Sequence, residues 1–166
     1  FGGATVSVDV LKQGGGSLED GATGAGGSGS SKSIAVSYAL ADGLSVGAGA
    51  GSVGTSDAGT DSDQETVYVK YTTGAVSAGV QMSQEETSGV YDWDTFQWGI
   101  SFNVSDNIAL GYGQRTVDRT DTNIDQEDSG FSASYTMGSM SISGNLNKSD
   151  DMHGTSGSDK ETTEIA

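Results

Sequence analysis

Apolar and polar residues alternate with a period of two along most of this chain. The alternation is clearest over residues 96–115, where Phe96, Trp98 and Ile100 are separated by small or polar residues. A short Ser-Asp-Asn turn at 105–107 interrupts it, and the alternation resumes at Ile108. This pattern is typical of a β-hairpin with one bulky apolar face and one small, polar face.

The same pattern predicts about ten strands along the chain. They are expected near 5–12, 34–40, 44–50, 67–71, 76–82, 96–104, 108–115, 131–137, 140–146 and 161–166. Short turns at 41–43, 72–74, 105–107 and 138–139 alternate with long polar loops at 13–31, 53–64, 84–94, 117–128 and 148–160. Transmembrane barrels sort their connections by length in this way, whereas Greek-key crossovers break the alternation. We therefore predict an all-β fold, an antiparallel up-and-down transmembrane β-barrel.

Aromatic residues recur just before the short turns. Tyr38, Tyr71, Phe102 and Tyr135 each fall on the predicted apolar face, about three residues ahead of a turn. Aromatic side chains are common in strands for packing reasons alone. Recurrence at one offset favours an interfacial girdle, in which amphipathic rings lie at the depth of the lipid headgroups.

Composition narrows the class of protein. Only 33% of the residues are hydrophobic and the formal net charge is -16, which would be unusual for a chain that buries a packed core. Alternation resolves this conflict, because it places the apolar residues on one continuous face that can meet lipid. No apolar run reaches the roughly 18 residues of a membrane helix. The acidic balance excludes nucleic acid as a partner, since phosphate binding needs clustered Lys and Arg.

Both ends of the chain carry a further expectation. Residues 1–7 align with the short-turn segments around Tyr71 and Tyr135, so a strand should precede residue 1, and Ala166 falls within the last predicted strand. A bilayer does not tolerate unpaired sheet edges. We expect residues 1–166 to form one partial barrel domain that is incomplete at both ends.

Strand parity assigns a set of polar residues to the inner face of such a barrel. A Lys or Arg on the lipid face near the midplane costs about 2–4 kcal/mol, so charged residues within strands should point inward. Two of the seven basic residues, Lys70 and Arg115, meet this description and could create a transverse field in a pore. The alternative is that they are only solvated. The predicted pore-lining residues are Asp9, Tyr68, Lys70, Gln81, Gln97, Asn103, Arg115, Asn145 and Asn147.

The acidic loops suggest a metal site. Loose calcium binding is predicted for Asp118, Asp121, Asp125 and Asp128. An EF-hand is excluded, because Gln126 stands where the loop needs Gly and no Glu follows at the twelfth position. The alternative is a solvated acidic surface, bridged by divalent ions to lipopolysaccharide. The single histidine, His153, has no fixed partners that would make a catalytic triad, so no catalytic residue and no cofactor other than calcium is expected.

Four hairpin segments carry a resemblance to a known family: SYALADGLSVGAGAG, KYTTGAVSAGV, SFNVSDNIALGYGQR and SYTMGSMSISGNL. They resemble the general diffusion porins of Gram-negative outer membranes, most closely the acidic, glycine-rich porins of alphaproteobacteria. This resemblance implies a sixteen-stranded barrel, a homotrimer, contact with outer-membrane lipid and lipopolysaccharide, and passive diffusion of ions and small hydrophilic solutes without catalysis. The chain would supply the C-terminal ten or so strands, and the constriction loop of the family would lie before residue 1.

A second interpretation comes from a different class of protein. A secreted or surface β-rich adhesin would also be rich in Gly and Asp. Calcium-binding β-solenoids, however, need a nine-residue repeat, and this chain has none. Solubility without detergent would favour the adhesin, and packing of Trp98, Ile100 and Phe102 against a second sheet would overturn the membrane assignment.

Overall fold

The computed structural model describes residues 4–12, 30–54, 61–87 and 92–165. In these residues ten strands form one antiparallel sheet, and each strand pairs with its neighbours in sequence. The strands are β1 (Ala4–Lys12), β2 (Ser30–Ala41), β3 (Leu44–Val53), β4 (Ser62–Thr73), β5 (Val76–Thr87), β6 (Trp93–Ser105), β7 (Ile108–Arg119), β8 (Gln126–Met137), β9 (Met140–Asp150) and β10 (Lys160–Ile165). The predicted all-β, up-and-down architecture is confirmed.

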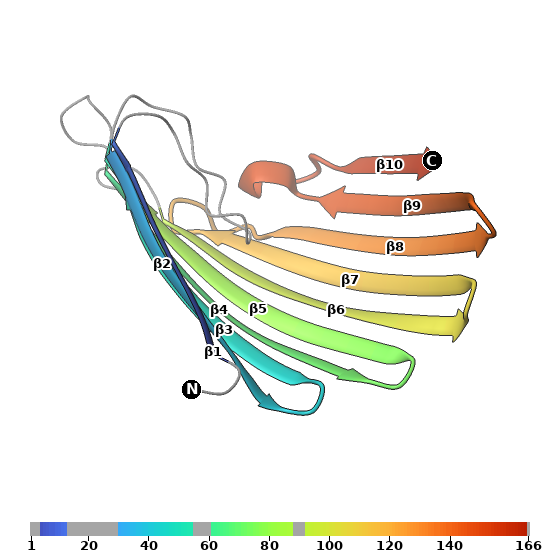
Figure 1. Ribbon diagram of the computed structural model, residues 1–166. Coiled ribbons are helices and arrows are strands. Elements are labelled where there is room, and N and C mark those ends of the chain that lie inside the picture. Colours follow the sequence, from blue (N-terminus) through green and yellow to red (C-terminus); the bar gives the residue numbers. More distant parts are fainter. Residues whose placement is uncertain (1–3, 13–29, 55–60, 88–91, 166) are drawn as a thin grey trace.

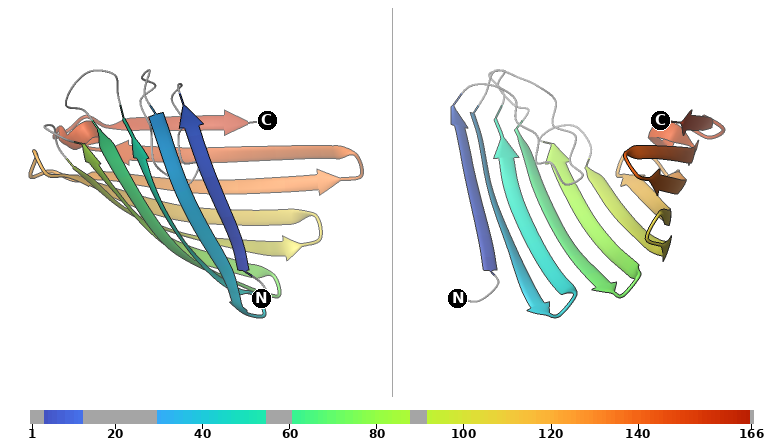
Figure 2. Two further views of the ribbon diagram at one scale, coloured as in Figure 1. Left: turned by 60° about the vertical axis from the view of Figure 1, so that its left-hand side comes forward. Right: turned by 45° about the vertical axis from the view of Figure 1, so that its right-hand side comes forward.

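The sheet is open and strongly curved, with β1 and β10 at its two edges (Figure 1). The short turns lie along one end of the strands, and the described β7–β8 and β9–β10 connections lie at the other end (Figure 2). A 3-10 turn, η1 (Met152–Gly154), lies between β9 and β10. No helix in the described ranges is long and apolar enough to cross a bilayer.

The short turns are built from residues that suit tight reversals. Gly43 follows Asp42 with φ 75, a left-handed conformation that costs other residues energy. A Cβ at Gly43 would also lie 1.9 Å from the backbone oxygen of Thr72, so only glycine fits there. In the β6–β7 hairpin, the Ser105 hydroxyl accepts a hydrogen bond from the Asn107 amide at 3.3 Å, which closes the turn locally.

The register of the strands gives their tilt. On β4 the residue in register with Tyr38 is Val69, two positions before Tyr71. The same two-residue step separates Tyr71 from Phe102 and Phe102 from Tyr135. Two residues span about 6.8 Å along a strand and two strand spacings span about 9.6 Å, which corresponds to a tilt of about 35°. That tilt lies in the range of transmembrane barrels and places the four rings at one height.

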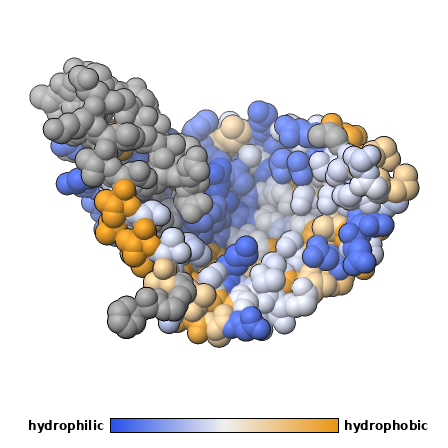
Figure 3. All heavy atoms as spheres, in the orientation of Figure 1, coloured by the Kyte–Doolittle hydropathy of each residue, from blue (hydrophilic) through white to orange (hydrophobic). Residues whose placement is uncertain are grey.

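Most large apolar side chains of the sheet are exposed. Trp98 is 36% exposed, and Ile100 and Phe102 are each 45% exposed, so within the described part of the chain no second sheet covers them. Only Val117 and Gln64 are buried among the described residues. In Figure 3 the hollow of the sheet is hydrophilic, and the hydrophobic residues gather along its outer side. The molecule thus has an apolar convex face and a polar concave face in place of a central core.

Several strands extend further than the alternation of residues predicts. β5 continues to Thr87, β8 begins at Gln126 and β9 ends at Asp150, all within expected loops. The predicted loops at 84–94, 117–128 and 148–160 are therefore too long. In these strand ends the outward side chains turn polar or acidic, so the hydrophobic signal stops while the backbone hydrogen bonds continue.

Candidate functional site: the polar concave face

Five polar side chains lie in one register row across the concave face. Tyr68 on β4 pairs with Gln81 on β5, which pairs with Gln97 on β6. Gln97 pairs with Arg115 on β7, and Arg115 with Asp128 on β8. We call these five residues the polar row. Strict sheet register brings them together although they are spread over 60 positions of sequence.

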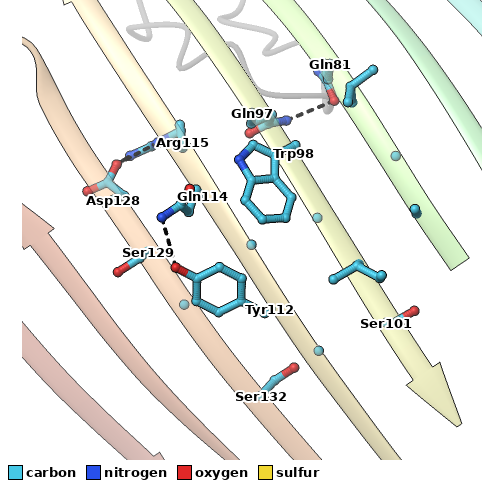
Figure 4. Close-up of a pocket in the computed structure, with 18 of the residues that line it drawn as sticks. Gln81, Gln97, Trp98, Ser101, Tyr112, Gln114, Arg115, Asp128, Ser129 and Ser132 are labelled. Carbon is cyan, nitrogen blue, oxygen red and sulfur yellow. Dashed lines mark hydrogen bonds and ion pairs between the residues drawn. The ribbon is translucent and has the colours of Figure 1, made fainter. Parts of the chain in front are cut away.

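Hydrogen bonds link the members of the polar row to one another and to the next row. Gln97 Nε2 donates to Gln81 Oε1 at 2.9 Å, and Gln81 Nε2 donates to the hydroxyl of Thr66 at 3.0 Å. Arg115 Nε donates to Asp128 Oδ2 at 2.7 Å. Figure 4 shows the Gln81–Gln97 and Arg115–Asp128 pairs side by side along the wall. These hydrogen bonds and the ion pair therefore hold the side chains of the polar row in place.

A row of glycines runs beside the polar row on the same face. Gly79, Gly99, Gly113 and Gly130 occupy four successive strands in register, and Lys70 precedes them on β4. A Cβ added at Gly99 or Gly113 would meet only backbone atoms within 4 Å, so no side chain covers the floor at these two positions, whereas a Cβ at Gly130 would lie 2.8 Å from Asn147 Oδ1. A groove of about 1050 Å³ lies here, and its lining includes Lys70, Gln97, Arg115 and the glycines. The glycine row thus leaves open space between the polar row and a row of serines that includes Ser101 and Ser132.

Charge on the groove is positive on balance. The Arg115 Nη2 and Asp128 Oδ2 atoms lie 2.6 Å apart, with 45% and 17% of the two side chains exposed. Lys70 makes no salt bridge with the described residues. Of the two cations with inward strand parity, Arg115 is neutralised by Asp128, and Lys70 can attract a mobile anion.

Replacing Asp128 by asparagine is expected to lower the free energy of unfolding by less than about 1 kcal/mol, because partly exposed ion pairs stabilise proteins little. Asparagine can still accept the hydrogen bond that Gln126 Nε2 donates at 3.0 Å. Urea titration of Asp128→Asn measures the effect. Asp150→Asn is the matched control, since Asp150 pairs with the half-exposed Lys148 at 2.7 Å. A loss well above that of the control would show that the Arg115–Asp128 pair is structural.

The remaining pore-lining predictions fall on known strand positions. Asn145 and Asn147 lie on β9 in register with Ser132 and Gly130, and so share the face of the glycine row. Asn103 lies near the end of β6. Asp9 lies on β1, but its side chain is outside the described residues. That these residues line a conducting pore stays a prediction.

The sequence did not assign Asp128 or the glycine row to this face. Asp128 was expected in a loop, because the β8 segment 126–130 has no apolar alternation. Counting back from the short turn at 138–139 and pairing β8 with β7 would have placed Asp128 opposite Arg115. Glycine gave no signal, since it has no side chain to mark a face.

The predicted calcium site is not assembled in the structure. Its four carboxylates belong to Asp118, Asp121, Asp125 and Asp128. Arg115 binds Asp128, and Arg119 binds Asp121 through two hydrogen bonds of 2.9 and 2.6 Å. Across the described ranges no group of three or more His, Cys, Asp or Glu side chains is placed to hold a metal ion. Asp118 and Asp128 lie on two different strands, β7 and β8, and calcium binding by the four aspartates stays a prediction.

Comparison with known proteins agrees with this geometry. Residues 1–166 match the family model described as Gram-negative porin. A search of curated proteins found no match. Among solved structures, the anion-selective porin from Comamonas acidovorans is similar in fold, with a TM-score of 0.71 and 14% identity, over 82% of this chain and 47% of that chain. The chain thus spans about half the length of that porin, and by its family match it belongs to the Gram-negative porins.

Proposed function

We propose that this chain forms part of the wall of a water-filled channel for passive diffusion of ions and small hydrophilic solutes. The family of the chain places it in the Gram-negative outer membrane. The observation that carries the proposal is the division of the sheet into an apolar convex face and a polar concave face. A lipid-facing barrel wall needs this division, because its two sides meet hydrocarbon and water.

The height of the apolar band supports the proposal. On β6 the outward residues from Phe96 to Val104 are apolar, and the next outward residue is Asp94. Eight residue steps along a strand tilted by about 35° rise roughly 22 Å, close to the apolar band of about 25 Å in outer-membrane barrels. On β5 the outward residues remain apolar to Met82 and are polar from Gln84 onward. The apolar band therefore has the height of a hydrocarbon core, and it ends at polar residues as a band that meets the headgroups should.

The wall chemistry supports passive selection by charge and width, without chemical conversion of solutes. The polar row offers fixed amides and an ion pair, and the glycine row widens the passage locally. Lys70 supplies a cation at one end of this floor. We infer a preference for anions along this part of the wall, and the similar fold of a porin named as anion-selective is consistent with that inference.

The residues at the edge of the apolar band suggest which molecules bind the outer surface of the wall. Outward acidic residues lie just beyond it on successive strands, including Glu65, Asp94 and Asp118, which share the outward parity of the strand ends. We propose that divalent cations link such carboxylates to lipopolysaccharide phosphates at headgroup depth. Assembly as a homotrimer is proposed from the family alone.

Single-channel recording in planar bilayers tests the proposed function. Purified protein is expected to insert and to give stable, ohmic conductance steps that scale with the conductivity of the salt solution, as a water-filled passage does. Heat-denatured protein in the same detergent is the control for leakage. Folded protein that inserts into vesicles without passing ions would contradict the proposal.

A further inference from the structure

The β9–β10 connection is fastened to the concave face of the wall. We call residues 151–159, which include η1, the strap. The main chain of His153 is held from both sides: its carbonyl accepts from Arg119 Nη1 at 3.0 Å, and its amide donates to Gln126 Oε1 at 2.9 Å. Arg119 and Gln126 lie on the face of the polar row, two or four positions from its members on β7 and β8. The strap therefore folds inward.

Arg119 is held firmly enough to act as an anchor. Its guanidinium donates to both carboxylate oxygens of Asp121, at 2.9 and 2.6 Å, and lies 4.9 Å from the ring centre of Trp93. Only 15% of the Arg119 side chain is exposed. Bidentate pairing combined with stacking on an indole fixes the plane of a guanidinium. The anchor joins β6, the β7–β8 connection and the strap.

Gln126 connects the strap to the polar row. Its Nε2 donates to Asp128 at 3.0 Å, and Asp128 binds Arg115. Val117, which lies between these rows on the same face, is 8% exposed and is one of the few buried residues of the described chain. A continuous chain of hydrogen bonds thus runs from the strap to the groove.

The strap is itself compact. The Asp151 carboxylate accepts from the Gly157 amide at 2.6 Å, and the Asp151 amide donates to Asp159 at 3.2 Å. A Cβ at Gly154 would lie 2.6 Å from the Thr122 hydroxyl, so η1 packs closely on the β7–β8 connection. Figure 1 places η1 at the loop ends of β8 and β9, and η1 contacts β8. Such a segment can hold a fixed position over the concave face.

We propose that the strap narrows the loop-side mouth of the channel and contributes to solute selection there. The proposal rests on the proposed function, since only a conducting wall has a mouth. Solutes that reach the glycine-floored groove from the loop side pass η1, in which His153 is exposed and has its main chain anchored. Selection in this protein then has two levels: the strap at the mouth, and the charged groove below it.

Single cysteines test the position of the strap. The chain has no cysteine, so His153→Cys places one reactive thiol at the strap. His153 has φ 58, so Thr155→Cys, at an exposed position with φ -110, serves as a second variant without positive-φ strain. An anionic methanethiosulfonate reagent is added during single-channel recording, from each side in turn. Each open channel is expected to show a stepwise loss of conductance, at a higher rate with reagent on the loop side, because reagent from the other side must first diffuse through the channel.

Lys148→Cys is the matched control. Lys148 is half-exposed on β9 and borders the groove, but it has the opposite strand parity to Asn147, so a thiol at this position points to the outward face. Labelling there should leave the conductance unchanged. If mass spectrometry finds the strap thiol labelled and the current does not change, or if the thiol is not labelled from the loop side, the strap does not line the mouth. If the unmodified protein passes no ions, the proposed function fails instead, and the two failures are thus distinguished.

Discussion

Replacing Ile100 by arginine is expected to lower the free energy of unfolding from a bilayer by about 2–4 kcal/mol, the cost of an arginine on the lipid face near the midplane. Ile100 is the central one of the five outward residues of β6, from Phe96 to Val104, and is 45% exposed. In a bilayer that exposure is contact with hydrocarbon. Urea titration of the protein folded in lipid vesicles, followed by tryptophan fluorescence, measures the loss.

The adjacent residue supplies a matched control. Ser101 faces the groove and pairs with Ser77 and Gly111, so Ser101→Arg places the same side chain in water. That variant should lose less than about 1 kcal/mol. Equal losses at positions 100 and 101 would mean that the convex face does not meet lipid. The porin assignment of the two faces would then be wrong, whatever the family match.

Alternation was sufficient to predict the architecture because one face of every strand meets a uniform environment. The hairpin around 105–107 forms as expected, with β6 and β7 on either side of Asp106 and Asn107. The aromatic residues before the short turns also step through the register by two positions per hairpin. The recurrence of aromatic residues before the short turns thus reflects the tilt of the strands in the whole sheet. The tilt itself could be measured only from the strand register.

The features that the sequence did not predict depend on contacts across strands. Asp128 lies opposite Arg115 only because β8 extends beyond its apolar segment. The strap is held by Arg119 and Gln126, which contact it through main-chain atoms of His153. Every non-proline residue has the same main-chain amide donor and carbonyl acceptor, so these two contacts leave no sequence pattern. The positions of polar strand ends and of loop anchors could therefore be found only in the structure, whereas the lipid-facing band could be predicted from the sequence.

The groove on the concave face is basic on balance, although the net charge of the chain is negative. The chain carries -16 overall, yet the charged residues that line the groove are Lys70, Arg115, Lys148 and a single acid, Asp128, and of the three cations Lys148 has the outward strand parity. Arg115 is compensated by Asp128 at 2.6 Å. A mobile ion in the groove is therefore attracted or repelled mainly by Lys70. This makes Lys70 the residue at which a single substitution should change ion preference most.

Reversing this charge with Lys70→Glu is expected to lower the anion-to-cation permeability ratio roughly fivefold at about 0.1 M salt. A unit charge about 8 Å away in water contributes about 0.5 kcal/mol, and screening over a Debye length of about 10 Å roughly halves it. Charge reversal changes the energy of an anion and of a cation in opposite senses, so their difference shifts by about 1 kcal/mol, close to a fivefold ratio. Reversal potentials across a salt gradient measure it, and the shift should shrink as salt rises.

Lys148→Glu separates the effect of position from that of net charge. It changes the charge of the chain by the same amount, but Lys148 lies on the outward face of β9 and pairs with Asp150. Since the low-dielectric wall and the outer solution lie between it and the passage, its reversal should leave the permeability ratio nearly unchanged. Equal shifts from both variants would mean that ions respond to the overall charge of the protein. A shift confined to Lys70→Glu would place the ion path along the glycine-floored groove, because screening limits the reach of Lys70 to about that distance.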